Sequence, residues 1–205
     1  MKNLKTNLEK AYNKSAHERN SASIQAWKIE ERSRFLSLLI TEKKENLLEI
    51  GAGPGKDSRF FQENGLKVVC TDLSPEMVKL CRQKGLDAKV MDFSDLQFSE
   101  NSFDAVYAMN SLLHLSKKDL PAVLQTINVI LKRDGLFFMG VYGGVDHEGI
   151  WEEDIYEPKR FFSFYEDAHL KRILGEVFEL LSFRQIDSGE SSRHLHFQSI
   201  ILRKH

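Results

Sequence analysis

Residues 47–55 read Leu-Leu-Glu-Ile-Gly-Ala-Gly-Pro-Gly, and this stretch decides the fold of the chain. Its first four residues are typical of a buried strand, and the three glycines let backbone N–H groups approach a ligand closely. A helix is predicted to begin at Lys56, so the ligand would lie near a helix N-terminus. A second apolar stretch ends at Asp72, about twenty residues after the first glycine, where a ribose-binding carboxylate is required. Together these parts predict a nucleoside-binding βαβ unit.

The spacing of the glycines distinguishes two classes of nucleoside cofactor. Dinucleotide-binding loops follow the order G-x-G-x-x-G, whereas this loop is G-x-G-x-G, with Lys56 in the third glycine's place and Glu49 before the first glycine. The loop resembles motif I of the class I S-adenosylmethionine-dependent methyltransferases, of the ubiquinone and small-molecule branch. Four further stretches resemble motifs of that family in the same order, at 68–72, 91–93, 102–107 and 131–137. The last of these has Arg-Asp where the family has Pro-Gly.

The resemblance implies that S-adenosyl-L-methionine is the cofactor. It implies that Asp72 holds both ribose hydroxyls, that Asp92 accepts a hydrogen bond from the adenine amino group, and that Glu49 lies near the methionine amino group. The residues expected at the cofactor are Tyr12, Arg19, Glu49, Gly51, Ala52, Gly53, Gly55, Asp72, Leu73, Asp92, Phe93, Met109 and Asn110. The alternatives are a plain strand–helix turn for the glycines, a helix cap for Asp72 and a surface turn for Asp92.

The composition is that of a single enzyme-sized domain. Of 205 residues, 41% are hydrophobic and 29% are charged. This composition is typical of neither a disordered nor a membrane-embedded chain. No apolar run approaches the roughly 18 residues of a membrane span, and the N-terminus lacks the apolar core of a signal peptide. Two cysteines, Cys70 and Cys81, predict reduced thiols in a cytoplasmic protein. The net charge of −1 offers no general attraction to nucleic acid, and we expect a monomer or homodimer.

Alternating strand and helix patterns predict an α/β fold. Strands are expected at 47–50, 68–72, 88–90, 104–109, 136–142, 178–186 and 194–202. They predict a Rossmann-like, doubly wound seven-stranded sheet with an antiparallel C-terminal hairpin and helices on both faces, which the resemblance also implies. We expect one methyltransferase domain over 1–205. It consists of an N-terminal helical lid (1–42), a cofactor-binding core (46–142), a substrate-side loop (143–165) and a C-terminal helix and hairpin (166–205).

Two side chains outside the glycine loop are candidates for closing the site and for catalysis. Tyr12 begins a Tyr-Asn-Lys-Ser-Ala element that resembles the lid of related enzymes, in which an aromatic ring closes over the cofactor. Arg19 would then meet the methionine carboxylate; a helix that merely packs on the sheet is the alternative. Methyl transfer by in-line displacement mainly requires positioning, and a base is needed only when the acceptor is protonated. His114 is the candidate base, and its alternative role is to bond a backbone carbonyl.

The segment 143–164 departs most from the family pattern. It holds an acidic run with interleaved aromatic residues, which would suit a cationic acceptor, although a solvated loop is the commoner explanation. The residues expected at the acceptor are His114, Tyr142, Trp151 and Tyr156. His194 and His196 alternate on one strand face, but no acidic or cysteine cluster completes a site, so we expect no metal.

The expected function is transfer of a methyl group to an O, N or S atom of a small molecule by in-line SN2 displacement. One alternative is a methyltransferase that acts on RNA or tRNA, which would require a basic and aromatic face. The other is a non-catalytic subunit that keeps the cofactor fold as a scaffold. Nucleic acid and membranes are not expected as partners.

Overall fold

A computed structural model of the chain describes residues 2–187, 189 and 195–205. Its helices are α1 (Lys2–Ser21), α2 (Ala26–Thr41), α3 (Lys56–Glu63), α4 (Pro75–Gln83), the 3₁₀ turn η1 (Leu112–His114), α5 (Leu120–Ile130) and α6 (Asp167–Gly175). Its strands are β1 (Asn46–Ile50), β2 (Lys67–Asp72), β3 (Asp87–Val90), β4 (Phe103–Met109), β5 (Leu131–Gly143), β6 (His147–Ile150), β7 (Phe161–Phe164), β8 (Glu179–Ile186) and β9 (His196–Arg203). Each strand expected from the sequence is present.

Seven of the strands form one twisted sheet in the order β3-β2-β1-β4-β5-β9-β8. The first five are parallel, and β9 runs antiparallel to both β5 and β8. Parallel strands require crossover helices, whereas the last two strands form the expected hairpin pairing. The fold class predicted from the sequence is therefore confirmed.

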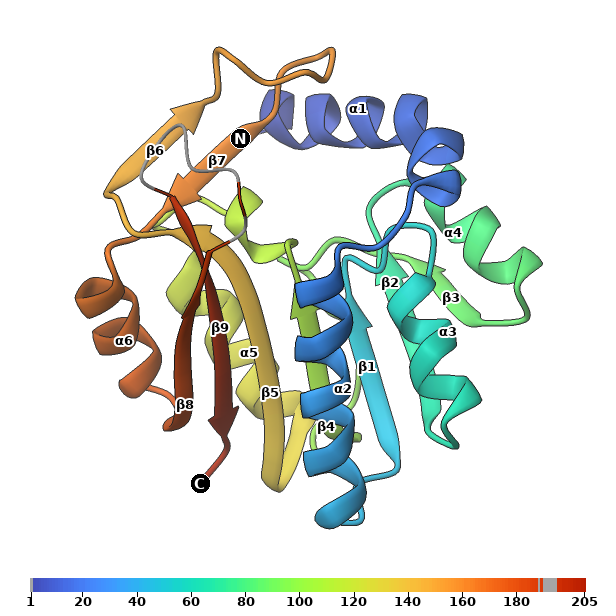
Figure 1. The fold of residues 1–205 in the computed structure, drawn as a ribbon, viewed down its shortest axis with the longest axis vertical. Helices are drawn as coiled ribbons and strands as arrows, with labels where there is room; N and C mark the ends of the chain where they lie inside the picture. The colour runs from blue at the N-terminus through green and yellow to red at the C-terminus, as the bar shows by residue number, and fades with distance from the viewer. Residues whose placement is uncertain (1, 188, 190–194) are drawn as a thin grey trace.

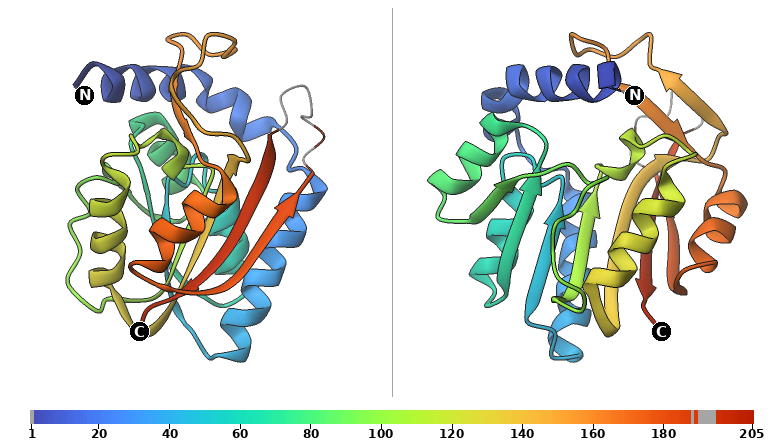
Figure 2. Two further views of the ribbon diagram at one scale, coloured as in Figure 1. Left: turned by 90° about the vertical axis from the view of Figure 1, so that its left-hand side faces the viewer. Right: turned by 180° about the vertical axis from the view of Figure 1, so that it is seen from behind.

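Helices cover both faces of this sheet (Figure 1). Helices α2 and α3 pack on one face, and α5 and α6 lie on the other, as the view from behind shows in Figure 2. Helix α1 lies across the end of the sheet at which the parallel strands finish, above the loops that follow β1, β2 and β4. Ligands of open α/β sheets bind outside this end of the strands, so α1 covers the expected site.

Aromatic rings fill the core between α2, α3 and the middle of the sheet. Tyr107 of β4 stacks on Phe138 of β5 with ring centroids 4.7 Å apart. Phe35 of α2 and Phe61 of α3 pack against the same pair, and all four side chains are fully buried. This cluster fixes β4 and β5 relative to each other, because both strands pack under the same two helices.

The segment 143–165 contains a two-stranded antiparallel sheet rather than only a loop. Strand β6 pairs with β7 from His147 opposite Phe164 to Ile150 opposite Phe161. This hairpin stands beside α1 at the same end of the molecule (Figure 1). Across the described residues, none of the helices combines the length and apolar character needed to cross a lipid bilayer.

We expect Phe138→Ala to lower the free energy of unfolding by about 3–5 kcal/mol, because it leaves a cavity under α2 and α3. Urea denaturation monitored by circular dichroism measures this loss. Ile40→Ala is the control: Ile40 lies on α2 with 60% of its surface exposed, and its truncation should change the free energy by at most about 0.5 kcal/mol. Equal losses in both variants would contradict this description of the core.

Candidate active site

The loop between β1 and α3 turns at its glycines. Gly51 and Gly53 have φ angles of 72° and 54°, in the left-handed region that residues with a Cβ rarely adopt. A side chain at Gly51 would overlap Ser111, so the loops after β1 and β4 are in close contact. Around Gly53 no described heavy atom lies within 4 Å of where a Cβ would stand, and this residue borders two cavities. Gly55 packs against Leu86 instead and is not part of their lining.

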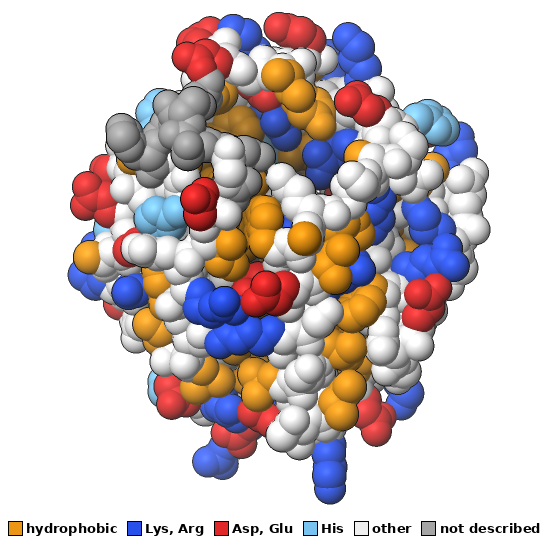
Figure 3. All heavy atoms as spheres, viewed as in Figure 1, with side chains coloured by type: hydrophobic (Ala, Val, Ile, Leu, Met, Phe, Trp, Pro, Cys, Tyr) orange, Lys and Arg blue, Asp and Glu red, His pale blue; other side chains and the backbone are white. Residues whose placement is uncertain are grey.

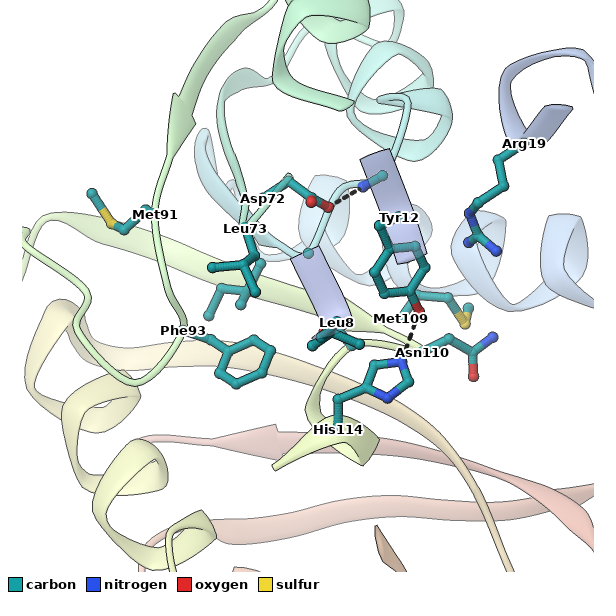
Figure 4. A pocket seen from close by; sticks show the side chains of 14 residues that line it. Leu8, Tyr12, Arg19, Asp72, Leu73, Met91, Phe93, Met109, Asn110 and His114 are labelled. Atoms are coloured by element: carbon teal, nitrogen blue, oxygen red, sulfur yellow. Dashed lines mark hydrogen bonds between the residues drawn. The ribbon is translucent and has the colours of Figure 1, made fainter. Parts of the chain in front are cut away.

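The carboxylate of Asp72, the last residue of β2, holds this loop in place. Its Oδ2 accepts a hydrogen bond from the Gly53 N–H and its Oδ1 accepts one from the Ser74 N–H, both at 2.8 Å. Burial raises the pKa of Asp72, although these two N–H groups work against the shift. Ser74, rather than Asp72, caps α4, because its Oγ accepts from the Met77 N–H at 3.1 Å. Figure 4 shows the Asp72 side chain directed into the cavity beneath α1.

Glu49 lies in β1 with 3% of its surface exposed. Its carboxylate accepts a hydrogen bond from the Ser58 hydroxyl, and burial together with the Asp57 carboxylate holds the pKa of Glu49 well above its ordinary range. The residue borders a cavity of about 260 Å³, which Ala52 and Arg19 also line. A buried carboxylate is costly unless a cation or donor meets it, so this position favours a cationic group.

The other end of the site lies between α1 and the loop after β3. Leu8, Leu73 and Phe93 face one another across a cavity of about 50 Å³ that opens into one of about 200 Å³ (Figure 4). Burial by itself would raise the pKa of Asp92, but the Lys5 ammonium at 2.7 Å and the Ser94 N–H hold it below its ordinary value. Lys5 and Leu8 are not among the residues expected at the cofactor from the sequence. They precede Tyr12 by seven and four residues, which places all three on one helix face. This spacing could have indicated that they line the same site as Tyr12.

Three cavities meet at Arg19 and Asn110. Both residues border the 50 Å³ and 260 Å³ cavities and a third cavity of about 320 Å³. Asn110 follows β4 with a φ of 55°, and its N–H donates to the Gly140 carbonyl at 2.8 Å. The Oδ1 of Asn110 and the Nε of Arg19 are buried and have no hydrogen-bond partner among the described residues. Met109 lines two of the three cavities. Polar atoms left in this state favour a bound polar ligand.

Tyr12 and His114 form a hydrogen bond that connects α1 to the turn after β4. The Tyr12 Oη lies 2.7 Å from His114 Nε2, and His114 Nδ1 lies 2.8 Å from the Phe161 carbonyl oxygen. Because a carbonyl only accepts, Nδ1 carries the proton, so Nε2 accepts from the tyrosine hydroxyl. Burial is the main cause that lowers the pKa of His114 to about 3. The ring is therefore neutral, and both of its nitrogens are hydrogen-bonded. One of the two partners is a backbone carbonyl, which is the alternative role considered for His114 from the sequence.

The 320 Å³ cavity adjoins the 50 Å³ cavity and shares with it Tyr12, Arg19, Asn110 and His114. Tyr142 and Trp151, both expected at the acceptor, line it. Tyr156 is not part of the lining, but its hydroxyl accepts from Arg19 Nη1 at 3.2 Å. Figure 3 shows basic side chains in the hollow beneath the 151–160 connection.

Basic partners neutralise much of the acidic run. Asp146 pairs with Lys117, and Glu152 pairs with Lys159 at 3.0 Å. Arg160 forms a two-pronged ion pair with Asp154, with Nε–Oδ2 at 2.8 Å and Nη2–Oδ1 at 2.7 Å. These pairs weaken the case for a cationic acceptor, because little unpaired negative charge faces the cavity.

His196 of the last strand does not line any of these cavities. His196 Nε2 is 2.8 Å from Asp167 Oδ1, on the side of β9 that faces α6. His194 lies outside the described residues. Within the described part of the chain, no group of three or more His, Cys, Asp or Glu side chains is arranged to hold a metal ion.

Known proteins resemble this chain in sequence and in fold. Residues 48–139 match the family model described as a methyltransferase domain. Malonyl-[acyl-carrier protein] O-methyltransferase of Hamiltonella defensa is 28% identical over 210 residues, covering 94% of this chain and 80% of that protein. Phosphoethanolamine N-methyltransferase of Triticum aestivum is 28% identical over 77% of this chain, and the match spans about a third (32%) of its own length.

A solved structure shows the same likeness at the level of the fold. The 1,6-didemethyltoxoflavin-N1-methyltransferase of Burkholderia thailandensis, with bound 1,6-didemethyltoxoflavin and S-adenosylhomocysteine, aligns with a TM-score of 0.72 and 22% identity. The alignment covers 96% of this chain and 87% of that one.

Gly51→Ala should lower the free energy of unfolding by about 2–4 kcal/mol, because it combines the overlap with Ser111 and the left-handed strain. Gly65→Ala is the matched control, since Gly65 has a φ of 91° with no described atom near the added Cβ. It should cost only the conformational part, about 1–2 kcal/mol. The double variant Gly51→Ala with Ser111→Gly should recover the steric part. Thermal unfolding of the ligand-free proteins tests this order, and no recovery would contradict the contact.

Lowering the pH from 7 to 5 should destabilise the protein in part through His114. The pKa of His114 is about 3 in the folded chain against 6.5 for an ordinary histidine. Between these two pH values only the unfolded chain binds the proton, so the free energy of unfolding decreases as the pH is lowered. One proton contributes at most about 1.4 kcal/mol per pH unit. Urea denaturation at several pH values should give a shallower slope for His114→Gln than for wild type. His17→Gln, at an exposed position of α1, should leave the slope unchanged; a wild-type slope in His114→Gln would contradict the burial of this ring.

Proposed function

We propose that the chain is an S-adenosylmethionine-dependent methyltransferase that methylates an O, N or S atom of a small molecule. The observation that carries the proposal is the junction at Arg19 and Asn110, where the cavities of about 50 and 260 Å³ beside the glycine loop meet a third cavity of about 320 Å³. A cavity of this volume lies at the small end of ligand pockets, roughly 300–1,000 Å³. It suits a small acceptor rather than a nucleic acid.

The residues around the 50 Å³ and 260 Å³ cavities have the chemistry that S-adenosyl-L-methionine requires. Glu49 is a buried carboxylate that would meet the methionine ammonium group, and Arg19, with its unpartnered Nε, would meet the methionine carboxylate. Asp72 would hold the ribose hydroxyls with lone pairs not used by Gly53 and Ser74. Backbone at Gly51, Ala52, Gly53, Met109 and Asn110 would border the methionine part. When bound, the cofactor supplies an electrophilic methyl group on a sulfonium.

The adenine ring would lie between apolar side chains at the other end of the site. Leu73 and Phe93 would contact its faces, with Leu8 above them on α1. Asp92 would accept from the adenine amino group, a role for which Lys5 is a competing partner at 2.7 Å. Adenine bound at this position either uses Asp92 lone pairs that Lys5 and Ser94 leave free or displaces Lys5.

Positioning is the main task that we assign to Tyr12 and His114. A nucleophile must lie in line with the bond that breaks, and side chains that fix its orientation supply most of the acceleration. His114 is a candidate base, but Tyr12 occupies its Nε2 in this structure. It can take a proton from an acceptor only after the tyrosine hydroxyl has moved. As long as the pair is intact, His114 keeps the Tyr12 ring over the junction of the cavities.

A methyltransferase acting on RNA is less well supported. Of the basic residues near the N-terminus, Lys5 is engaged by Asp92, and the whole chain has a formal charge of −1. Recognition of a phosphate backbone requires a clustered basic face.

Calorimetric titration with S-adenosylmethionine, S-adenosylhomocysteine and NADH tests the donor assignment. We expect binding of both adenosyl compounds and none of NADH. Asp72→Ala should weaken S-adenosylhomocysteine binding at least about 100-fold, because two hydrogen bonds to a charged group contribute roughly 3–6 kcal/mol. Asp87→Ala, at an exposed position on the neighbouring strand, is the control and should bind normally. Unchanged affinity in a folded Asp72→Ala protein would overturn the site assignment.

A further inference from the structure

Basic groups outnumber acidic ones around the 320 Å³ cavity. Arg19, Lys28 and Arg160 line it, together with Glu153 and Asp154. Asp154 is already committed, since its side chain is 4% exposed and both of its oxygens accept hydrogen bonds from Arg160. Its charge therefore balances Arg160 and does little to attract a cation from solvent.

The second guanidinium near this cavity lacks a carboxylate partner. No acidic side chain of the described residues forms an ion pair within 4.0 Å of Arg19, whose Nη1 donates to the neutral Tyr156 hydroxyl. The two guanidinium carbons lie 5.2 Å (Arg19) and 5.4 Å (Arg160) from the centroid of the Tyr12 ring. Two like charges beside one ring repel each other, so an anion bound near both lowers the electrostatic energy.

Arg160 is held in position with donors to spare. A guanidinium has five N–H groups, and three of them donate within the described chain, two to Asp154 and one to Tyr12 at 3.1 Å. One N–H remains on each terminal nitrogen. The Tyr156 ring lies 3.8 Å from the guanidinium carbon and the Phe162 ring 5.0 Å from it. Such a fixed pair of donors matches the two oxygens of an oxyanion.

We propose that the methyl acceptor is a small organic anion whose carboxylate or phosphate group binds the two remaining N–H groups of Arg160, beside Arg19, whose Nε is assigned to the methionine carboxylate. Its apolar body would lie against Tyr142, Trp151 and Phe162, which give the cavity an aromatic wall. This inference rests on the proposed methyltransferase function and names the class of molecule that it acts on. It replaces the cationic acceptor that the acidic run suggested.

The test compares four probes of similar shape on the protein saturated with S-adenosylhomocysteine. Benzoate and phenyl phosphate carry an anion, benzylamine carries a cation and benzyl alcohol is neutral. We expect an anionic probe to bind at least ten times more tightly than benzylamine and benzyl alcohol in calorimetric titrations. The stronger of the two anions distinguishes a carboxylate from a phosphate acceptor. Because this comparison uses the unmodified protein, it does not depend on the folding of any variant.

Two variants then locate the binding site of the preferred anion. Arg160→Gln should weaken its binding at least tenfold. Lys159→Gln removes the same charge from the adjacent residue, which is paired with Glu152 outside the cavity lining, and should leave the affinity unchanged. Equal effects of both variants, or binding of benzylamine as tight as that of the anions, would overturn this inference while leaving the donor site intact. Failure of S-adenosylhomocysteine to bind in the first step would overturn the proposed function and this inference with it.

Discussion

The carboxylate of Asp72 is the constraint on which the rest of the site depends. A buried carboxylate is tolerated only when hydrogen bonds replace its lost hydration, and here the N–H groups of Gly53 and Ser74 supply them. One side chain at the end of β2 thereby fixes the glycine loop after β1 and the start of α4. The cavity between these two loops follows from that arrangement, as does the direction in which the loop N–H groups point.

Helix α1 is joined to this framework by polar contacts and by one small apolar cluster, in which Ala16 packs against Met77 and Leu80 of α4. Lys5 pairs with Asp92, Tyr12 bonds His114, and Asn13 Oδ1 accepts from the Ser74 hydroxyl at 2.6 Å. By contrast, α2 is held by fully buried apolar residues such as Phe35 and Leu39. Individual polar contacts contribute modestly to stability because water competes for the same groups. The helix over the site is therefore attached less firmly than the helices that pack on the sheet.

Local patterns predicted the parts of the molecule that depend on local rules. The apolar stretches gave the strands, and the glycine spacing with Asp72 gave the loop geometry, because both are set within a few residues. The β6–β7 hairpin was not predicted, since His-Glu-Gly-Ile at 147–150 shows no strand alternation and gains its partner only across the 151–160 connection. The Tyr12–His114 hydrogen bond and the Arg160–Tyr12 contact join residues far apart in the chain. Single residues at such distances carry no periodic signal, so the sequence indicated Tyr12 and His114 separately but not as a pair.

The position of Tyr12 has a consequence for how the two cavities fill. Its ring borders both of them, and its hydroxyl is bonded at once to the turn after β4 and to Arg160 beside β7. Any displacement of α1 that moves Tyr12 away from one cavity therefore also removes part of the wall of the other. A ligand that binds more tightly when α1 is in this position therefore raises the affinity of the other cavity for its ligand. By thermodynamic linkage, the second ligand raises the affinity for the first by the same factor. We therefore expect the affinities for the methyl donor and the acceptor to be coupled through the Tyr12 ring.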